Sequence, residues 1–363
     1  MRQIIAVALV AAIASAACAN DRIPFNVESV ASFNEPWALA FLPDGNLLVT
    51  EKSGQLLLVT TDGDVSEPIG GVPDVDYGGQ GGLGDVALHP DFADNGVIYL
   101  SYAESGEGDT RGAAIARAVL DQGDMALSDV TVIWRQFPKV SGKGHYGHRM
   151  LFDDAGYLWV SSGERQKFDP SQDMQSSMGK ILRLNDDGTA AEGNPFYDQG
   201  GVTAEIWSLG HRNPLGIDFD TEGRLWNTEM GPRHGDELNL VIKGENYGYP
   251  LVSNGRHYSG MPIPDHDTRP DLEAPKVWWK PSIAPADLMI YSADAFADWT
   301  GDAFIPGLAG KTLVRVEING DEAEEAERYD MGKRIRGVEQ GPNGNIWVLE
   351  DQSAGRLLKL TPR

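Results

Sequence analysis

The feature that most constrains the fold of this 363-residue chain is a short motif that recurs along it. Each copy has an apolar run, a turn containing Gly or Asp and a second apolar run that ends in a polar residue. Alternating runs bounded by turn residues predict β-hairpins. Five clear copies lie at 38–51, 85–102, 149–162, 216–229 and 337–350, and a weaker sixth copy lies at 287–320. A third alternating run follows some of the copies, at 54–63, 179–188 and 355–363.

The spacing of these six copies is about 55 residues, which suits four-stranded blades joined by long loops. Arranging the blades in a ring also protects strand edges that an open sheet would expose. The sequence therefore predicts an all-β fold, a six-bladed β-propeller of four-stranded antiparallel sheets. A pair of β-sandwiches is the alternative, and the even repeat makes it less favourable. The first strand, at 25–33, is expected to complete the last blade.

Large aromatic residues occupy one equivalent place in the second run of four copies. They are Tyr99, Trp159, Trp226 and Trp347. Side chains of this size mostly stabilise a fold by packing, so they predict contacts between neighbouring sheets. The 43 glycines and 21 prolines agree with many short strands joined by tight turns.

The first 19 residues have the pattern of a secretory signal peptide. Arg2 precedes an apolar run over 4–13, and a small-residue cleavage site follows at 17–19. Residues 20–363 would then form a single propeller domain that contains no cysteine. Acylation of Cys18 as a lipoprotein anchor is a less favoured alternative, because the preceding residues lack the usual Leu. A cysteine-free exported chain suggests a bacterial periplasmic or secreted protein.

The formal net charge of −24 argues against partners that need basic surfaces. Nucleic acids and anionic membrane surfaces both bind clusters of Lys and Arg. No segment after the leader is apolar enough to predict a transmembrane span.

Five motifs follow one another in the chain, each in its own repeat. They are GQGGL at 79–83, GHYGHRMLF at 144–152, GHRNP at 210–214, EMGP with DELN at 229–239, and RIRGVEQGPNGNIWV at 334–348. Each is weak alone, but the ordered set resembles the soluble quinoprotein glucose/sorbosone dehydrogenase family, and most closely its aldose sugar dehydrogenase branch. The resemblance covers nearly the whole chain after the leader. It implies a six-bladed propeller that uses pyrroloquinoline quinone (PQQ) and calcium.

The activity that the resemblance implies is oxidation of an aldose sugar at C1 to a lactone, with hydride transfer to the quinone. His145 would be the general base, and an imidazole with an ordinary pKa of about 6.5 suits that task. Its Gly-rich loop is expected to leave it accessible. Glu164 would orient this imidazole, and Arg212 would stabilise the oxyanion of the reduced quinone. The electron acceptor and the preferred sugar are not identified by the sequence.

The resemblance also implies the residues that bind the cofactor. Arg334 and Arg336 alternate on one strand, so their side chains point the same way. They need an acidic counterpart, either a ligand or a neighbouring carboxylate, and the three carboxylates of PQQ are the preferred answer. The other implied contacts are Gln80, Arg212, Asn213, Tyr258 and the segment Ala284, Pro285 and Ala286.

Two calcium sites are implied in the same way. Backbone carbonyls of Gly231 and Pro232 would bind a catalytic calcium, which accepts such oxygen ligands and acts as a Lewis acid. Glu237, through its carboxylate, and Tyr247, through its carbonyl, would bind a second, structural ion. A transition metal is not expected, because no cluster of His and Cys has metal-ligand spacing.

Three residues depart from the family pattern. Ala309 stands where members often have Lys, which leaves one cofactor contact in doubt. Met230 replaces a commonly polar residue and is expected to be harmless if only carbonyls bind calcium. His148 stands where Gly is more frequent and is expected to narrow the pocket beside His145.

Two other classes of function remain open from the residues. A calcium-dependent, lactonase-like propeller hydrolase would need carboxylate and Asn ligands that converge on the channel, and would give Arg334 and Arg336 no task. A non-catalytic sugar-binding propeller would not need His145 together with Arg212.

Overall fold

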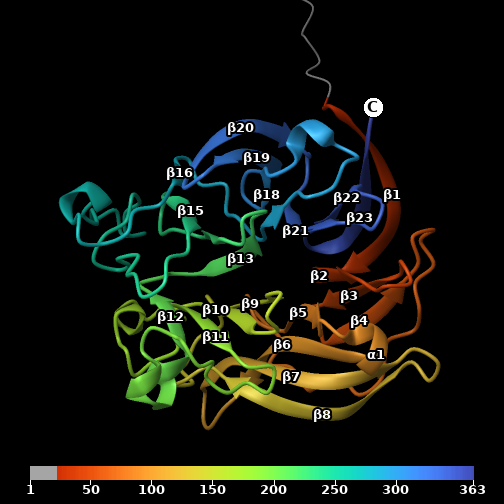
Figure 1. The fold of residues 1–363 in the computed structure, drawn as a ribbon, viewed down its shortest axis with the longest axis horizontal. Helices are drawn as coiled ribbons and strands as arrows, with labels where there is room; N and C mark the ends of the chain where they lie inside the picture. The colour runs from red at the N-terminus through yellow and green to blue at the C-terminus, as the bar shows by residue number, and fades with distance from the viewer. Residues whose placement is uncertain (1–22) are drawn as a thin grey trace, which may run out of the picture.

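The computed structural model describes residues 23–363 and shows six β-sheets arranged radially around a central axis (Figure 1). This architecture confirms the six-bladed propeller predicted from the repeats. The predicted leader, with Cys18, lies outside the described residues. Within 23–363, no helix is both long and apolar enough to cross a membrane.

The first three sheets follow the chain in order. The first contains β2 (Pro36–Phe41), β3 (Leu47–Glu51) and β4 (Gln55–Val59). The second contains β5 (Leu83–Leu88), β6 (Val97–Ser105), β7 (Arg111–Asp121) and β8 (Ala126–Arg135), with the short helix α1 (Phe92–Asn95) between β5 and β6. The third contains β9 (Gly147–Phe152), β10 (Leu158–Ser162), β11 (Lys180–Leu184) and β12 (Ile206–Leu209), with the 3-10 turns Asp169–Ser171, Tyr197–Gln199 and Gly201–Glu205.

The remaining sheets complete the ring. The fourth contains β13 (Pro214–Phe219), β14 (Leu225–Glu229), β15 (Asp236–Leu240) and β16 (Val277–Trp279), with a 3-10 turn at His266–Thr268. The fifth contains β17 (Met289–Ile290), β18 (Ala303–Gly307), β19 (Thr312–Asn319) and β20 (Glu322–Asp330), with a 3-10 turn at Ala297–Trp299. The sixth contains β21 (Ile335–Gln340), β22 (Ile346–Glu350), β23 (Ser353–Pro362) and β1 (Phe25–Asn34).

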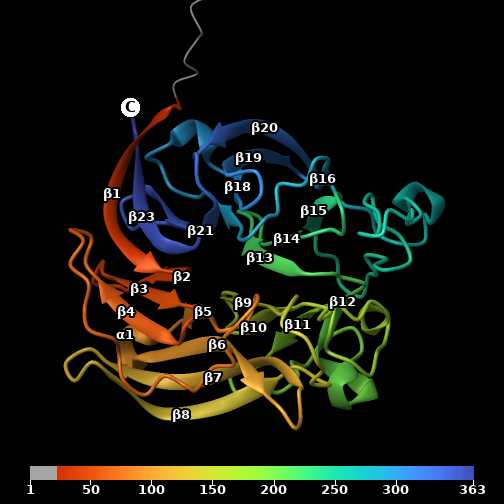
Figure 2. The same ribbon diagram turned by 180° about the vertical axis from the view of Figure 1, so that it is seen from behind.

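The ring is closed by the first strand, as the sequence predicts. Strand β1 pairs antiparallel with β23 along its length, from Phe25 opposite Pro362 to Asn34 opposite Ser353. Figure 2 shows the two strands lying together at the edge of the last sheet. The two ends of the described chain are therefore joined by hydrogen bonds instead of a covalent link.

One sheet has three strands where four were predicted. The segment after β4 still lies along its edge, because Ser66 N donates to Leu58 O at 2.9 Å and Ile69 N to Leu56 O at 2.8 Å. Pro68 interrupts this segment, and proline has no N–H with which to continue a ladder of hydrogen bonds. The fourth position of this sheet is therefore occupied by an irregular segment that does not form a strand.

Apolar side chains fill the spaces between successive sheets in six separate clusters. The aromatic residues singled out from the repeats lie in these clusters, and Tyr99 and Trp226 are fully buried. A small seventh cluster at the centre contains Trp37, Ala38 and Leu215, with Met230 packed against it. The ring is thus stabilised mainly by apolar contacts between neighbouring blades.

Candidate active site

Residues from several blades meet at one end of the channel because of strand direction. Innermost strands β2, β5, β9, β13, β17 and β21 contact one another around the axis. In each antiparallel hairpin, the start of the innermost strand lies beside the end of the second strand. His145 precedes β9, Glu164 follows β10, and Arg212 precedes β13. The fold therefore brings these three together from two blades.

His145 and Glu164 form a buried pair at this end. The imidazole Nδ1 lies 2.5 Å from Glu164 Oε1, and the two side chains are 6% and 0% exposed. The other carboxylate oxygen accepts from the backbone N–H groups of Lys167 and Phe168, the latter at 2.8 Å. The expectation that a Gly-rich loop leaves His145 open to solvent is wrong, because the loop folds over it and the whole residue is 5% exposed.

The protonation of the pair follows from its surroundings. Burial lowers the pKa of His145, and the positive charge of Arg212 adds to that effect, whereas the hydrogen bond that His145 donates to Glu164 opposes it. Burial alone would raise the pKa of Glu164, but the hydrogen bonds that it accepts from His145 and from Phe168 N hold it below its ordinary value. The pair at neutral pH is a neutral imidazole beside a carboxylate. That carboxylate accepts Nδ1–H and leaves Nε2 as the free acceptor.

The loop that carries His145 is held by two side chains. Gln80 Oε1 accepts from His145 N at 2.6 Å, so the predicted cofactor residue Gln80 also positions the base. The guanidinium of Arg165 donates to Gly144 O at 2.9 Å and Arg111 O at 2.6 Å, and lies 3.9 Å from the Tyr146 ring centroid. Sequence reasoning missed Arg165, because its partners are carbonyl oxygens, which have no sequence signal.

Arg212 and Asn213 lie directly against this pair. Arg212 O accepts from Glu164 N at 2.8 Å, which ties the two loops together. Arg212 Nη1 donates to Met230 O at 2.7 Å and Gly231 O at 2.5 Å. Within the described residues, Arg212 Nε and Asn213 Oδ1 are buried and have no hydrogen-bond partner. Such orphaned groups are costly unless a ligand or water satisfies them.

The residues predicted for two calcium sites line one small cavity. This space of about 10 Å³ is bordered by Gly231, Pro232, Glu237 and Tyr247, and by Arg212. A space of this size holds one ion or water molecule. The structure thus brings together four residues that the sequence assigned to separate ions. Gly231 O already accepts from the Arg212 guanidinium, so a cation at this oxygen would share it.

Glu229 also borders this cavity and was missed by sequence reasoning. It lies opposite Glu237 in the register of β14 and β15. Glu229 accepts from His211 Nδ1 at 3.1 Å and from Arg212 N at 2.6 Å. Burial raises the pKa of Glu237, and the charge of Glu229 raises it further. Two buried carboxylates in one place favour either a proton or a bound cation.

A second cavity of about 350 Å³ lies beside these loops, and Arg334 and Arg336 line it. In the structure, both guanidinium groups pair with Asp351, the neighbouring carboxylate that the sequence left open as one of two counterparts. Arg334 Nε is 2.8 Å from Asp351 Oδ2, and Arg336 Nη2 is 2.9 Å from Oδ1. Among the described residues, the terminal nitrogens of Arg334 have no hydrogen-bond partner. One carboxylate thus serves two cations, which leaves positive charge and donors for a further anion.

The other predicted cofactor residues do not all border the 350 Å³ cavity. Ala284 borders the 350 Å³ cavity, whereas Ala286 is fully buried and Pro285 pairs with Gly307 in an isolated bridge. Tyr258 is 73% exposed, and its ring centroid lies 6.0 Å from Arg212 Cζ, at the rim of the site.

Lys52 is a cation in this cavity that sequence reasoning missed. Its Nζ donates to Gly79 O at 3.1 Å and lies 3.6 Å from Glu35 Oε1. Leu308 borders the cavity, but the following Ala309 has no charge to offer there. Lys52 therefore supplies an ammonium group in this cavity, where Ala309 stands at a position at which family members often have Lys.

A cavity of about 950 Å³ between the third and fourth blades shares no residue with these groups. Within residues 23–363, no group of three or more His, Cys, Asp or Glu side chains is arranged to hold a metal ion. A metal at the small cavity would therefore depend on backbone carbonyls as well as Glu237 and Glu229.

Comparison with known proteins identifies the family of this chain. Residues 33–359 match the family model described as Glucose / Sorbosone dehydrogenase. The aldose sugar dehydrogenase YliI of Escherichia coli (strain K12) is 42% identical over 336 residues, which cover 91% of each chain.

Solved structures agree as well. The crystal structure of the soluble aldose sugar dehydrogenase from Escherichia coli in the apo-form superposes with a TM-score of 0.88 at 41% identity, and covers 93% of this chain and 100% of that one. The PQQ-bound aldose sugar dehydrogenase from Streptomyces coelicolor gives a TM-score of 0.78 at 28% identity, over 93% and 98% of the two chains. This chain therefore belongs to the glucose/sorbosone dehydrogenase family of oxidoreductases.

Proposed function

We propose that this enzyme oxidises aldose sugars at C1 to lactones and depends on PQQ and calcium to do so. The observation that carries the proposal is the neutral His145, buried against Glu164, beside the cationic Arg212. A base next to a fixed positive charge is what removal of a hydroxyl proton and stabilisation of an oxyanion require.

The chemistry of the donors supports PQQ as the cofactor. Lys52, Arg334 and Arg336 border the 350 Å³ cavity and would hold carboxylates of this tricarboxylate. The orphaned Arg212 Nε and Asn213 Oδ1 would find partners on its polar edge. The cavity volume lies within the range of small-molecule sites. These residues fit a planar polyanion better than a neutral ligand.

The small cavity beside Arg212 is the proposed place for calcium. The carbonyls of Gly231 and Pro232 and the carboxylate of Glu237 are hard oxygen donors of the kind that this ion prefers. We propose that Glu229 completes this set and that Tyr247 contributes its carbonyl. When bound, the quinone supplies the two-electron oxidant and calcium supplies Lewis acidity.

The residues of the chain then have distinct tasks. Nε2 of His145 takes the proton of the C1 hydroxyl, because Glu164 occupies Nδ1. The Glu164 carboxylate stabilises the imidazolium that results. The Arg212 guanidinium stabilises negative charge that develops on oxygen nearby, in a site with little water to screen it.

Reconstitution with PQQ and calcium tests this proposal. We expect the metal-free apoenzyme, supplied with PQQ, calcium and glucose, to reduce an artificial electron-accepting dye. It should not do so when either addition is left out. Replacement of the base in His145→Ala should lower kcat at least about 100-fold. Dye reduction without PQQ, or full activity of His145→Ala, would overturn the proposal.

We also propose that the enzyme works outside the cytoplasm, in the periplasm or after secretion. The support is the signal-like pattern of residues 1–19. N-terminal sequencing of the exported protein tests this, with a mature end near Asn20 as the expected result. An intact Met1 in the periplasmic fraction would contradict it.

A further inference from the structure

The floor of the 350 Å³ cavity is a stack of buried rings that no proposed role yet includes. Trp37 and His148 both border the cavity and are 3% and 1% exposed. Their ring centroids lie 5.0 Å apart with an angle of 12° between the planes. Arg149 Cζ lies 4.2 Å from the indole centroid of Trp37. These contacts leave the imidazole of His148 little freedom to turn.

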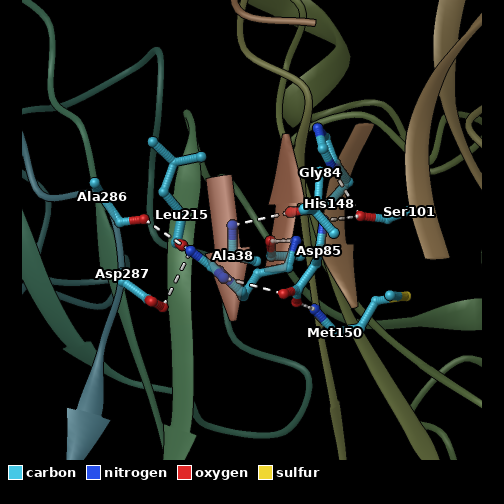
Figure 3. A network of polar contacts seen from close by, with 12 residues as sticks. Ala38, Gly84, Asp85, Ser101, His148, Met150, Leu215, Ala286 and Asp287 are labelled. Atoms are coloured by element: carbon cyan, nitrogen blue, oxygen red, sulfur yellow. Dashed lines mark hydrogen bonds and ion pairs between the residues drawn. The ribbon is translucent and has the colours of Figure 1, made fainter. Parts of the chain in front are cut away.

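The tautomer of His148 is set by Ser101. The Ser101 Oγ lies 2.8 Å from His148 Nδ1 and accepts a hydrogen bond from Asp85 N at 2.8 Å (Figure 3). The hydroxyl has one hydrogen, and Nδ1 is the acceptor that it reaches. Ser101 therefore donates to Nδ1, which places the ring proton of a neutral imidazole on Nε2.

The neighbouring backbone is shaped to admit this ring. A side chain on Gly84 would meet His148 Cε1 at 1.9 Å and Nδ1 at 2.3 Å, so the imidazole occupies the space that any other residue would need. Gly84 O accepts from Thr50 Oγ1 at 2.6 Å, and this hydroxyl accepts from Ala38 N at 3.0 Å. The network in Figure 3 thus joins the strand that carries Trp37 to the strand that receives His148.

The Nε2–H group of His148 faces the cavity. No protein group among residues 23–363 accepts from it, and it is not among the polar atoms that are sealed from solvent without a partner. Since the residue is 1% exposed, the space that Nε2 reaches is the cavity that His148 borders. Burial also lowers the pKa of His148 to about 3, so the imidazole stays neutral and keeps this single donor.

We infer that His148 is a cofactor-binding residue, whose Nε2–H donates a hydrogen bond to an oxygen of the anionic quinone in this cavity. The residue thereby adds a neutral donor at the floor to the cations Lys52, Arg334 and Arg336 at the walls. This inference rests on the proposed function, because it concerns the same cofactor.

Equilibrium binding of PQQ to the apoenzyme in calcium buffer, measured by titration calorimetry, tests the inference without any turnover. His148→Phe keeps a flat ring against Trp37 and removes the donor, so its Kd should rise about tenfold. His148→Gln retains an N–H donor and should bind within about threefold of the wild type. Ser101→Ala frees the tautomer and should give an intermediate Kd.

The outcomes are distinguishable. A His148→Phe protein that binds PQQ as tightly as the wild type would overturn the inference and leave the proposed function intact. Equal losses in His148→Phe and His148→Gln, with native unfolding temperatures, would show that ring shape and not the donor matters, and would also overturn it. A wild-type protein that binds no PQQ would instead reject the proposed function. If His148→Phe does not fold, His148→Met serves as the variant without a donor, with the same expected rise in Kd.

Discussion

At the scale of single residues, two histidines three positions apart offer the site opposite hydrogen-bonding groups, an acceptor and a donor. His145 meets an acceptor at Nδ1, the Glu164 carboxylate, and so exposes a lone pair at Nε2. His148 meets a donor at Nδ1, the Ser101 hydroxyl, and so exposes a proton at Nε2. Burial lowers the pKa of both. Their different roles thus arise from the partner at one nitrogen, and not from their charge.

Replacement of Glu164 by Gln tests the role of the carboxylate behind the base. Activity should fall as pH decreases through the pKa of His145, which lies below its ordinary value. Glu164→Gln removes a group that raises this pKa, so the acidic limb of kcat/KM should move to lower pH. The value of kcat should fall about 10- to 1000-fold. Profiles of kcat/KM from pH 4 to 9 measure both effects.

Glu104→Gln is the control for this experiment, because Glu104 pairs with Arg135 and Lys139 away from the site. It should leave the profile unchanged. A Glu164→Gln enzyme whose acidic limb stays in place would show that the carboxylate does not act on the base.

At the scale of elements, the turn after β10 carries backbone strain beside the site. Arg165, Gln166 and Phe168 have φ values of 59°, 60° and 65°, which side chains other than Gly seldom adopt. Each such residue costs on the order of 1 kcal/mol. The turn is stabilised by the N–H groups that bind Glu164 and by the three carbonyls that bind the Arg165 guanidinium. The strain is concentrated where the base and its carboxylate have to be aligned.

Arg165→Met tests whether this guanidinium holds the turn and the His145 loop. The substitution leaves buried carbonyls without donors and should lower the free energy of unfolding by about 2–4 kcal/mol. Denaturant titration measures this loss, and hydrogen exchange of residues 142–146 should become faster. Arg183→Met is the matched control, since Arg183 lies 3.6 Å from the Tyr157 ring centroid but away from the site. Unchanged exchange at 142–146 would contradict the assigned role.

At the scale of the whole molecule, the ring depends on the pairing of its two ends. Strand β1 covers the edge of β23 and adds the buried side chains of Phe25 and Phe33 to two of the clusters between blades. An exposed edge strand invites pairing with other chains. Closure therefore affects both stability and solubility.

Removal of residues 23–34 should open the ring. We expect the shortened protein to elute from size-exclusion chromatography as aggregates, because β23 then has an unpaired edge and two phenylalanine sites are empty. Deletion of Arg363 alone, which follows the last paired residue Pro362, is the control and should leave a native monomer profile. A monomeric, cooperatively folded protein without β1 would show that the lateral clusters suffice.

A group of buried carboxyl groups near the centre of the ring is a second property of the whole molecule. A cavity of about 290 Å³ is bordered by Asp85, Asp218, Asp287 and Glu339, with Arg149 among them. Burial raises the pKa of Asp218 and of Asp287 to about 7 each, and it raises that of Glu339 well above its ordinary value. The residues that border this cavity thus include four carboxyl groups but a single guanidinium, that of Arg149.

Glu339→Gln should make the enzyme more stable in alkaline solution. A carboxyl whose pKa is raised on folding stabilises the protein below its unfolded pKa, and this contribution is lost as pH rises through the folded pKa. The variant removes that loss, so its unfolding temperature at pH 8 should exceed that of the wild type by about 1–3 °C. The difference should shrink at pH 5. Equal unfolding temperatures at pH 8 would argue that this carboxyl is not destabilising when charged.

Local patterns in the sequence specify the strands, their grouping into blades and the order of the motifs. The hairpins at 149–162 and 216–229 are β9–β10 and β13–β14, and the equivalent positions of Trp159 and Trp226 in these hairpins place both rings between blades. These features follow from the alternation of apolar residues, a pattern that involves only residues close together in the sequence. The motifs also made His145 and Arg212 candidates, whereas Glu164 was a candidate because it follows the second run of its hairpin.

The partner of each of these residues, by contrast, depends on the tertiary fold. Asp351 pairs with Arg334 and Arg336, Arg165 holds the loop of the base, and Glu229 lies opposite Glu237. Ser101, on another blade, decides which nitrogen of His148 carries the proton. Partners of this kind are backbone carbonyls or side chains far away in the chain. Their contacts depend on how the blades close around the axis, which no local pattern of residues encodes.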